Sequence, residues 1–300
     1  MKLKTDTFEE NIFKSTSIEK DEILLKNENS LILFPIDHFS QNINKKKLFS
    51  QQNILLSFKN QNLTKYLQKN LFNLSKGMMN YIINELSGQF RDVIKNKNGN
   101  YFFSDLIKKC DKEQRLIIIN EIRSNIYEDC FDEYANYPIQ LLFEIASCEE
   151  ELKLLLSSFD DFNKIIMASM HKYGNYVIQK LIMNIPENIR KEFNSIFVQL
   201  IPTLSRDAYG VLPVKKFINY TKDRKIIKQF INSILNNFIS ISENPYGNYL
   251  IQYLLEIWWN KKEGDFLKNI IISKFQILSK NEYSLHICRF FIQLCNIKSF

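Results

Sequence analysis

Three polar and aromatic side chains recur together in this 300-residue chain. An Asn is followed directly by a Tyr, and a Gln stands three residues after the Tyr. Complete copies of this triplet are Asn136/Tyr137/Gln140, Asn175/Tyr176/Gln179 and Asn248/Tyr249/Gln252. Asn and Gln amides both donate and accept hydrogen bonds, which suits the edge of an unpaired base, and a Tyr ring offers a flat surface for stacking. The triplet therefore predicts a surface for single-stranded nucleic acid.

The triplets belong to a longer repeat. A small residue precedes each of them, and the small residues stand at positions 99, 135, 174, 210, 247 and 284. Three further copies of the triplet are incomplete, and a weaker first copy lies one period earlier; in chain order these four are Thr64/Lys65/Gln68, Asn100/Tyr101/Ser104, Val211/Leu212/Lys215 and Leu285/His286/Arg289. Periods of roughly 36 residues are typical of stacked supersecondary units.

Each unit is expected to be helical. Three residues before the small position the chain carries Asn96, Asp132, His171, Asp207, Asn244 and Asn281. Asn and Asp are preferred helix N-caps, and apolar residues at helical intervals follow, whereas strand signals are scarce. We therefore expect two or three helices per unit in a right-handed all-α solenoid, with all three triplet side chains projecting from one face. Pro138 and Pro213 are expected to bend their helices or to weaken those two repeats.

The same side chains allow another interpretation. Asn and Gln on an exposed helix face could merely be solvated, or could satisfy hydrogen bonds between repeats. Three identical triplets in register favour nucleic-acid binding over solvation, because solvation does not require the same amides each time.

The strings Tyr134-Ala-Asn-Tyr-Pro-Ile-Gln140, Tyr173-Gly-Asn-Tyr-Val-Ile-Gln-Lys180 and Tyr246-Gly-Asn-Tyr-Leu-Ile-Gln252 resemble the core helix of the Pumilio (PUF) repeat. The resemblance implies a crescent of three-helix repeats that binds single-stranded RNA antiparallel to the chain, about one base per repeat. It implies that Asn with Gln reads uracil. Base-edge contacts would then come from Asn100, Ser104, Asn136, Gln140, Asn175, Gln179, Asn248, Gln252, Thr64 and Gln68, and stacking from Tyr101, Tyr137, Tyr176, Tyr249 and His286. Phosphate contacts would come from Lys108, Lys180, Lys215, Lys216 and Arg289.

Departures from the family pattern leave a second function open. PUF domains typically have eight repeats, of which about seven are recognisable here. The repeat expected to read guanine has Leu285 and Arg289, and Val211 with Lys215 cannot read a base edge by the family's code. The favoured function is regulation of mRNA translation or stability through U-rich sites in 3′ untranslated regions, with effector proteins on the convex face. The alternative is a degenerate scaffold, or a factor that reads RNA structure during ribosome biogenesis.

Composition fits a binding protein rather than an enzyme. The net charge of +7 suits a polyanionic partner. Five scattered cysteines and three separated histidines form no disulfide, metal-ligand or catalytic pattern, so we expect no cofactor. No membrane span or leader is apparent, and we expect a cytoplasmic protein, or a nucleolar one if the alternative holds. Residues 1–48 are expected to form a cap or a partly disordered arm, and residues 49–300 the repeat domain.

Overall fold

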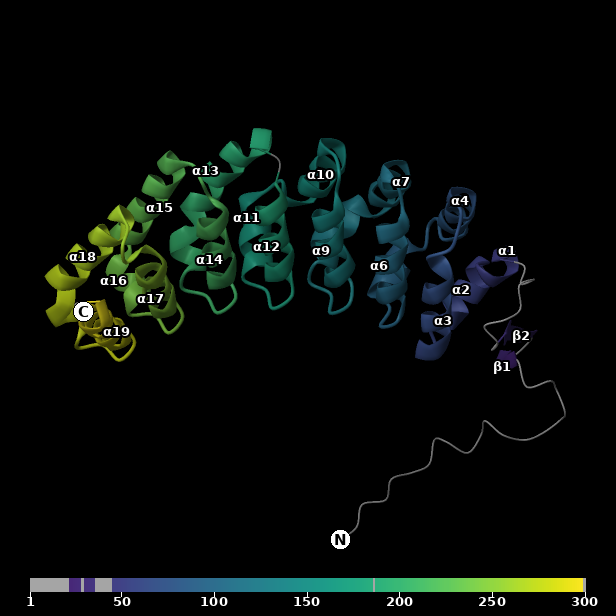
Figure 1. Cartoon of the computed structure of the whole chain (residues 1–300), viewed down its shortest axis with the longest axis horizontal. Coiled ribbons are helices and arrows are strands. Elements are labelled where there is room, and N and C mark those ends of the chain that lie inside the picture. The colour runs from purple at the N-terminus through teal and green to yellow at the C-terminus, as the bar shows by residue number, and fades with distance from the viewer. Residues whose placement is uncertain (1–21, 28–29, 36–44, 186, 299–300) are drawn as a thin grey trace, which may run out of the picture.

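The computed structural model describes residues 22–27, 30–35, 45–185 and 187–298. From Lys45 onward every regular element of the described chain is a helix, and the helices follow one another along a gently curved array (Figure 1). None of the described helices combines the length and the apolar character that a membrane crossing requires. The predicted all-α solenoid is confirmed.

Two rows of helices run along the array. The row that carries the triplets, called the front row here, consists of α3 (Gln61–Leu71), α6 (Gly99–Lys109), α9 (Asn136–Ile145), α12 (Gly174–Asn184), α14 (Val211–Tyr220), α17 (Gly247–Trp258) and α19 (Ser284–Lys298). The back row consists of α4 (Lys76–Glu85), α7 (Lys112–Ile122), α10 (Glu149–Leu156), α13 (Glu187–Leu204), α15 (Arg224–Asn236) and α18 (Lys262–Leu278). Figure 1 shows the front row on the inner side of the arc.

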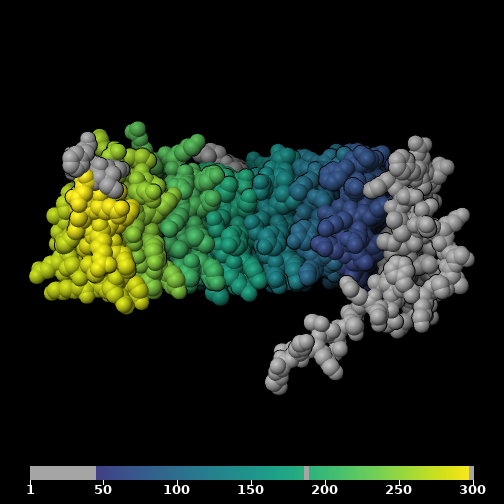
Figure 2. All heavy atoms as spheres, turned by 60° about the horizontal axis from the view of Figure 1, so that its bottom comes forward, coloured from purple at the N-terminus to yellow at the C-terminus, as the bar shows by residue number. Residues whose placement is uncertain are grey.

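Short helices lead into the front row and complete three-helix units. They are α1 (Lys45–Leu48), α2 (Gln51–Ser57), α5 (Phe90–Lys95), α8 (Ile126–Asp129), α11 (Phe162–Ser169) and α16 (Phe238–Ser242), together with the 3-10 turns Arg123–Asn125 and Ser157–Phe159. One continuous hydrophobic core runs between the two rows, because each helix buries one apolar stripe against its own unit and its neighbours. The space-filling view shows the result as one elongated body without a break between units (Figure 2).

The recurrent small residue has a steric cause. A Cβ on Gly174 would lie 2.6 Å from the carbonyl oxygen of Ala168, six residues earlier, and one on Gly210 would lie 2.7 Å from that of Leu204. Ser284 tolerates its Cβ because its hydroxyl donates to the corresponding carbonyl of Leu278 at 2.7 Å. The small residue therefore lets each front-row helix begin close against the short helix before it.

The predicted caps are confirmed, and the expected effect of the prolines is wrong. At all six positions a side-chain acceptor takes the backbone N–H groups two and three residues on, as Asp207 Oδ1 does from Tyr209 (2.9 Å) and Gly210 (2.8 Å). Pro138 and Pro213 are each the third residue of their helix. An N–H in the first turn has no intrahelical partner, so its absence neither bends nor weakens α9 or α14.

The N-terminal region contains two strands, although the sequence showed few strand signals and predicted an all-α fold. Strands β1 (Glu22–Asn27) and β2 (Ser30–Pro35) pair antiparallel, with Asn27 opposite Ser30, so two residues separate them as in a tight hairpin. The predicted cap or arm at residues 1–48 lies mostly outside the described residues. Its last four residues form α1, so the helical array begins slightly before the boundary expected at residue 49.

Candidate nucleic-acid interface

Large aromatic side chains stand exposed at the same position of four front-row helices. The exposed fractions are 60% for Tyr101, 61% for Tyr137, 48% for Tyr176 and 59% for Tyr249. Each is the second or third residue of its helix, and α6, α9 and α12 are direct neighbours. His286 is exposed at the corresponding position of α19. A row of solvated rings at repeat spacing forms a platform on which flat ligands can stack.

The asparagines of the triplets are buried, contrary to the expectation that all three side chains project from the exposed face. Asn175 is fully buried, and its Nδ2 donates to the carbonyl oxygens of His171 (2.9 Å) and Lys172 (3.0 Å). The same pair of bonds recurs at Asn100, Asn136 and Asn248. These amides hold the turn that starts each helix, so both N–H groups of each Asn are occupied. Their contact with a base stays a prediction.

The glutamines lie half-buried above the asparagines. Gln179 Nε2 donates to Asn175 Oδ1 at 3.0 Å, and Gln140 and Gln252 make the same bond to Asn136 and Asn248 at 2.9 and 3.0 Å. One amide N–H of each Gln is thereby used, which fixes the side chain in one orientation. The Gln carbonyl oxygen and its second N–H remain available, and this donor–acceptor pair matches the edge of a base.

The incomplete triplets of α3 and α6 differ in detail. Thr64 is buried and donates to the Ser57 carbonyl at 2.9 Å, while Ser104 donates to the Asn100 carbonyl at 2.8 Å. Gln68 Nε2 donates to Asp105 Oδ2 at 2.6 Å. Between these helices lies a hollow of about 430 Å³, lined by Gln61, Thr64, Lys65, Gln68, Asn98 and Tyr101. The triplet Thr64/Lys65/Gln68 of the first repeat and Tyr101 of the next repeat thus line the same hollow.

Two front-row helices carry no amide at the triplet positions. In α14, Val211 is buried and Leu212 half-buried, and the Lys215 ammonium lies 5.1 Å from the centroid of the Tyr253 ring. Burial lowers the pKa of Lys215. In α19, Leu285 is partly exposed and Arg289 exposed. These two helices offer cations in place of amides.

Several predicted phosphate ligands already have protein partners. Lys180 pairs with Glu144 of the preceding repeat at 2.6 Å, and Lys108 pairs with Asp105 at 3.4 Å. Lys216 lies over the Tyr220 ring at 5.7 Å. The sequence analysis missed Asp105 and Glu144. The repeat period itself could have indicated them, because Gln68 to Asp105 and Glu144 to Lys180 span one unit.

The cap of α12 differs from all others. His171 Nδ1 accepts from Tyr173 N at 3.2 Å and from Gly174 N at 3.3 Å, so this nitrogen carries no proton. Burial lowers the pKa of His171, and the charge of Lys172 lowers it further. Across the described residues no group of three or more His, Cys, Asp or Glu side chains is arranged to hold a metal ion.

Taken together, the fold and site define an α-solenoid of three-helix repeats with an aligned aromatic and amide row. The model of the Pumilio-family RNA binding repeat matches residues 89–123, 164–192 and 237–257. These three segments of the chain are thus similar to repeats of the PUF family.

Similar proteins share the repeat region at low identity. Pumilio homolog 12 of Arabidopsis thaliana is 22% identical over 202 residues, which are 66% of this chain and 33% of that protein. Suppressor protein MPT5 of Saccharomyces cerevisiae is 26% identical over 216 residues, 67% of this chain and 24% of that protein. The matched region is thus a third or less of each relative's length.

Solved structures share the fold. The Puf4 RNA binding domain bound to an HO endonuclease RNA 3′ UTR recognition sequence aligns with a TM-score of 0.73 and 16% identity, covering 88% of this chain and 78% of that one. The RNA-binding domain of yeast Puf5p bound to SMX2 RNA aligns with a TM-score of 0.68 and 22% identity, covering 80% and 68%.

Proposed function

We propose that this protein binds single-stranded RNA along the front row. The observation that carries the proposal is the row of exposed tyrosines, three of which are followed three residues later by a glutamine that a buried asparagine orients. Stacking contributes roughly 1–3 kcal/mol per base and tolerates any base, while the oriented amide supplies selectivity. The RNA-bound structures of similar fold support the same ligand class.

The preferred sequence follows from the triplets. The family pattern assigns uracil to Asn with Gln, and RNA running antiparallel to the chain meets α17, α14, α12 and α9 in that order. The proposed core is therefore 5′-U-N-U-U-3′, with the unselected base opposite Val211 and Lys215 of α14. We further propose that such sites lie in mRNA 3′ untranslated regions, and that binding regulates translation or stability in the cytoplasm through effector proteins.

A second function is favoured by one observation. Neither α14 nor α19 has an amide at the triplet positions, so the row of readers is interrupted. A protein scaffold, or a nucleolar factor that binds RNA by its shape, would need no continuous row. Selection from a randomised RNA pool separates the two, because enrichment of 5′-U-N-U-U-3′ supports the first and an unenriched or structured pool supports the second.

The platform itself is tested by Tyr176→Ala. Loss of one stacking ring should weaken RNA binding by roughly fivefold to a hundredfold without changing which base is chosen. Phe266→Ala is the matched control, because Phe266 is 54% exposed but lies on the back-row helix α18. Equal affinities for the wild type and the Tyr176 variant, measured by fluorescence anisotropy, would remove the front row as the binding surface.

A further inference from the structure

A second row of tyrosines runs beside the triplets. It consists of the residues directly before five of the small residues, called the edge tyrosines here: Tyr134, Tyr173, Tyr209, Tyr246 and Tyr283. Tyr209 and Tyr246 are 41% and 43% exposed, and the other three are half-buried. One such ring therefore stands at the start of each of the five successive helices α9, α12, α14, α17 and α19. The triplets do not include this row, although it repeats with the same period.

Each edge tyrosine lies one helical turn from a stacking position. Its carbonyl oxygen accepts the N–H of the stacking residue three positions later, at 3.0 Å between Tyr209 and Leu212 and at 3.2 Å between Tyr246 and Tyr249. Residues three apart lie on the same side of a helix, with Cβ atoms about 5–6 Å from each other. A nucleotide whose base stacks on Tyr249 therefore lies within reach of the Tyr246 hydroxyl.

A tyrosine hydroxyl is chemically suited to the backbone of such a strand. Tyrosine side chains are among the groups that donate to phosphate oxygens in protein–DNA complexes, and RNA has the same phosphates. Two lysines predicted for that role contact carboxylates instead, Lys180 with Glu144 and Lys108 with Asp105. A strand that is read at one base per repeat also has one phosphate per repeat. The spacing of the edge tyrosines therefore matches the backbone of the proposed RNA.

The charge beside the row differs between its members. Glu282 directly precedes Tyr283 and raises the pKa of that tyrosine, so a negative charge lies near its hydroxyl and would repel a phosphate. Tyr246 follows Pro245, and the side chain that caps its helix is the neutral Asn244. The two neighbouring edge tyrosines thus offer a phosphate different surroundings.

The other two edge tyrosines in the middle of the row have a cation or a capped carboxylate nearby. The Lys172 ammonium lies 4.5 Å from the centroid of the Tyr173 ring. Beside Tyr209, the Asp207 carboxylate accepts from two N–H groups at the start of α14. The positive end of the helix dipole offsets part of the charge of this carboxylate.

We propose that Tyr173, Tyr209 and Tyr246 bind successive phosphates of the RNA through their hydroxyls, while the triplets take the bases. This inference rests on the proposed function, because it requires bases along the front row. The contact is neutral, so it adds affinity for every sequence without adding to counterion release. Since the RNA runs antiparallel to the chain, Tyr246 binds the phosphate one nucleotide nearer the 5′ end than the phosphate bound by Tyr209.

The variants Tyr246→Phe and Tyr209→Phe test the proposal, because each removes only a hydroxyl. The probe is a cytosine-flanked RNA with one 5′-U-A-U-U-3′ site, and affinity is measured by fluorescence anisotropy. Affinity should fall about threefold to tenfold for Tyr246→Phe and less for Tyr209→Phe, where Asp207 adds a negative charge. The slope of log affinity against log salt should not change, whereas the loss of a lysine that contacts a phosphate reduces it.

RNAs with a single methylphosphonate linkage identify the group that is bound, because this linkage replaces a charged phosphate oxygen by a methyl group. At one linkage Tyr246→Phe should cause no further loss of affinity, since the contact is already broken. For Tyr209→Phe that linkage should lie one nucleotide nearer the 3′ end. A loss that persists with a methylphosphonate at every linkage in turn would overturn the phosphate contact.

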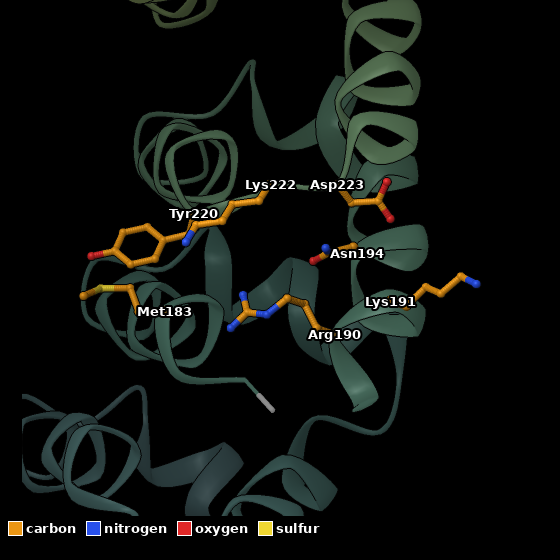
Figure 3. A pocket seen from close by; sticks show the side chains of 7 residues that line it. All are labelled: Met183, Arg190, Lys191, Asn194, Tyr220, Lys222 and Asp223. Carbon is orange, nitrogen blue, oxygen red and sulfur yellow. The ribbon is translucent and has the colours of Figure 1, made fainter. Parts of the chain in front are cut away.

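Two other tyrosines serve as matched controls. Tyr220 is 40% exposed at the opposite end of α14, where it lines a hollow of about 320 Å³ together with Met183 (Figure 3). Tyr283 stands at the edge position but beside Glu282. Tyr220→Phe and Tyr283→Phe should each change the affinity by less than about twofold.

The outcomes separate this inference from the proposed function. Unchanged affinity in Tyr246→Phe, or an equal loss in either control, overturns the role of the edge tyrosines. If Tyr176→Ala still weakens binding in that case, the proposed function stands without this inference. Absence of RNA binding by the wild-type protein overturns both.

Discussion

Helices α12 and α14 are neighbours with the same backbone course and different side chains at the three triplet positions, of which the first is buried in both helices. Both begin at a small residue pressed against a carbonyl six residues earlier, and both follow a side-chain cap. Yet α12 presents Asn175, Tyr176 and Gln179, whereas α14 presents Val211, Leu212 and Lys215. The small residue and the cap are therefore common to both helices, while the side chains at the three triplet positions differ between them.

The largest expected effect comes from changing the base that α12 reads. Asn175→Ser with Gln179→Glu should replace a preference for uracil by one for guanine at one nucleotide, because Glu accepts from the guanine N1 and N2 donors. The change should be roughly tenfold to a hundredfold in relative affinity, measured with RNAs that differ at that base.

The single variant Gln179→Glu is the control for this change. It brings a carboxylate oxygen against Asn175 Oδ1, which now accepts from Gln179 at 3.0 Å. Binding of all RNAs should weaken, with no gain for guanine. An unchanged uracil preference in the double variant, in a protein that still binds RNA, would show that α12 does not read a base.

Exchanging the buried first residues of the two triplets, Asn175 of α12 and Val211 of α14, should lower the free energy of unfolding. Asn175→Val leaves the Lys172 carbonyl without its Nδ2 donor and should lower the free energy of unfolding by about 1–2 kcal/mol in urea titrations. Val211→Asn should cost less, since the carbonyls of residues 207 and 208 lie where those of His171 and Lys172 lie in α12. Equal costs in both directions would contradict the turn-holding role of the asparagine.

Lys215→Gln should separate charge from base reading. If this ammonium contacts a phosphate, its loss weakens binding a few-fold for every sequence and reduces the slope of log affinity against log salt by about 0.7. Lys225→Gln, on the exposed first turn of α15, serves as the control. A slope that Lys215→Gln leaves unchanged would place the phosphates elsewhere.

The smallest expected effect is a loss of stability in acid that comes from the His171 cap of α12. Since the pKa of His171 is lowered from 6.5 in the folded protein, the unfolded chain takes up a proton first as the pH falls. Stability is therefore complete above about pH 6.5 and decreases below it. Urea titrations at about pH 7.5 and pH 5.5 should show this loss in the wild type and less of it in His171→Asn, which restores the acceptor used at Asn244. An identical loss in both proteins would exclude the cap as its source.

Much of this architecture was predictable because it rests on local rules. The period of the small residues predicted stacked units, and the Asn and Asp caps fixed where the front-row helices begin. The effect of Pro138 was predicted wrongly. The sequence indicated that Pro138 lies in a helix but not that it lies in the first turn, where its missing N–H has no intrahelical partner to lose. The hairpin was missed because short apolar runs at residues 22–35 do not distinguish a strand from other elements.

The site was predictable in position but less so in detail. The tyrosines are exposed as expected, whereas the asparagines are buried, because an amide that can pair with a base can equally pair with carbonyls of its own turn. The bond from Gln68 to Asp105 and the ion pair of Glu144 with Lys180 were not predicted, because each joins two successive repeats. Contacts between repeats decide such cases, and no single repeat contains them.

The two halves of the array share one hydrophobic core but differ in the interactions that supplement it. In the first half, Arg115, Asp129 and Glu151 are the buried charged residues among the described side chains, and each belongs to an ion pair between repeats. In the second half, the rings of Phe197, Phe217, Phe230 and Trp258 follow one another with centroids 4.7 to 6.3 Å apart. The first half thus adds buried ion pairs between repeats to the shared hydrophobic core, whereas the second half adds a continuous series of packed rings.

Because of this difference, acid should act on the first half of the array, whereas tryptophan fluorescence reports on the second half. Burial acts to raise the pKa of Glu151, but hydrogen bonds from Arg115 and the Ser147 backbone outweigh it and lower that pKa, so its stabilisation is lost as acid protonates it. Both tryptophans, Trp258 and Trp259, lie in the second half of the array. Acid below about pH 4.5 should therefore loosen the first half while tryptophan fluorescence still reports packing around Trp258 and Trp259, and far-ultraviolet circular dichroism should register the change.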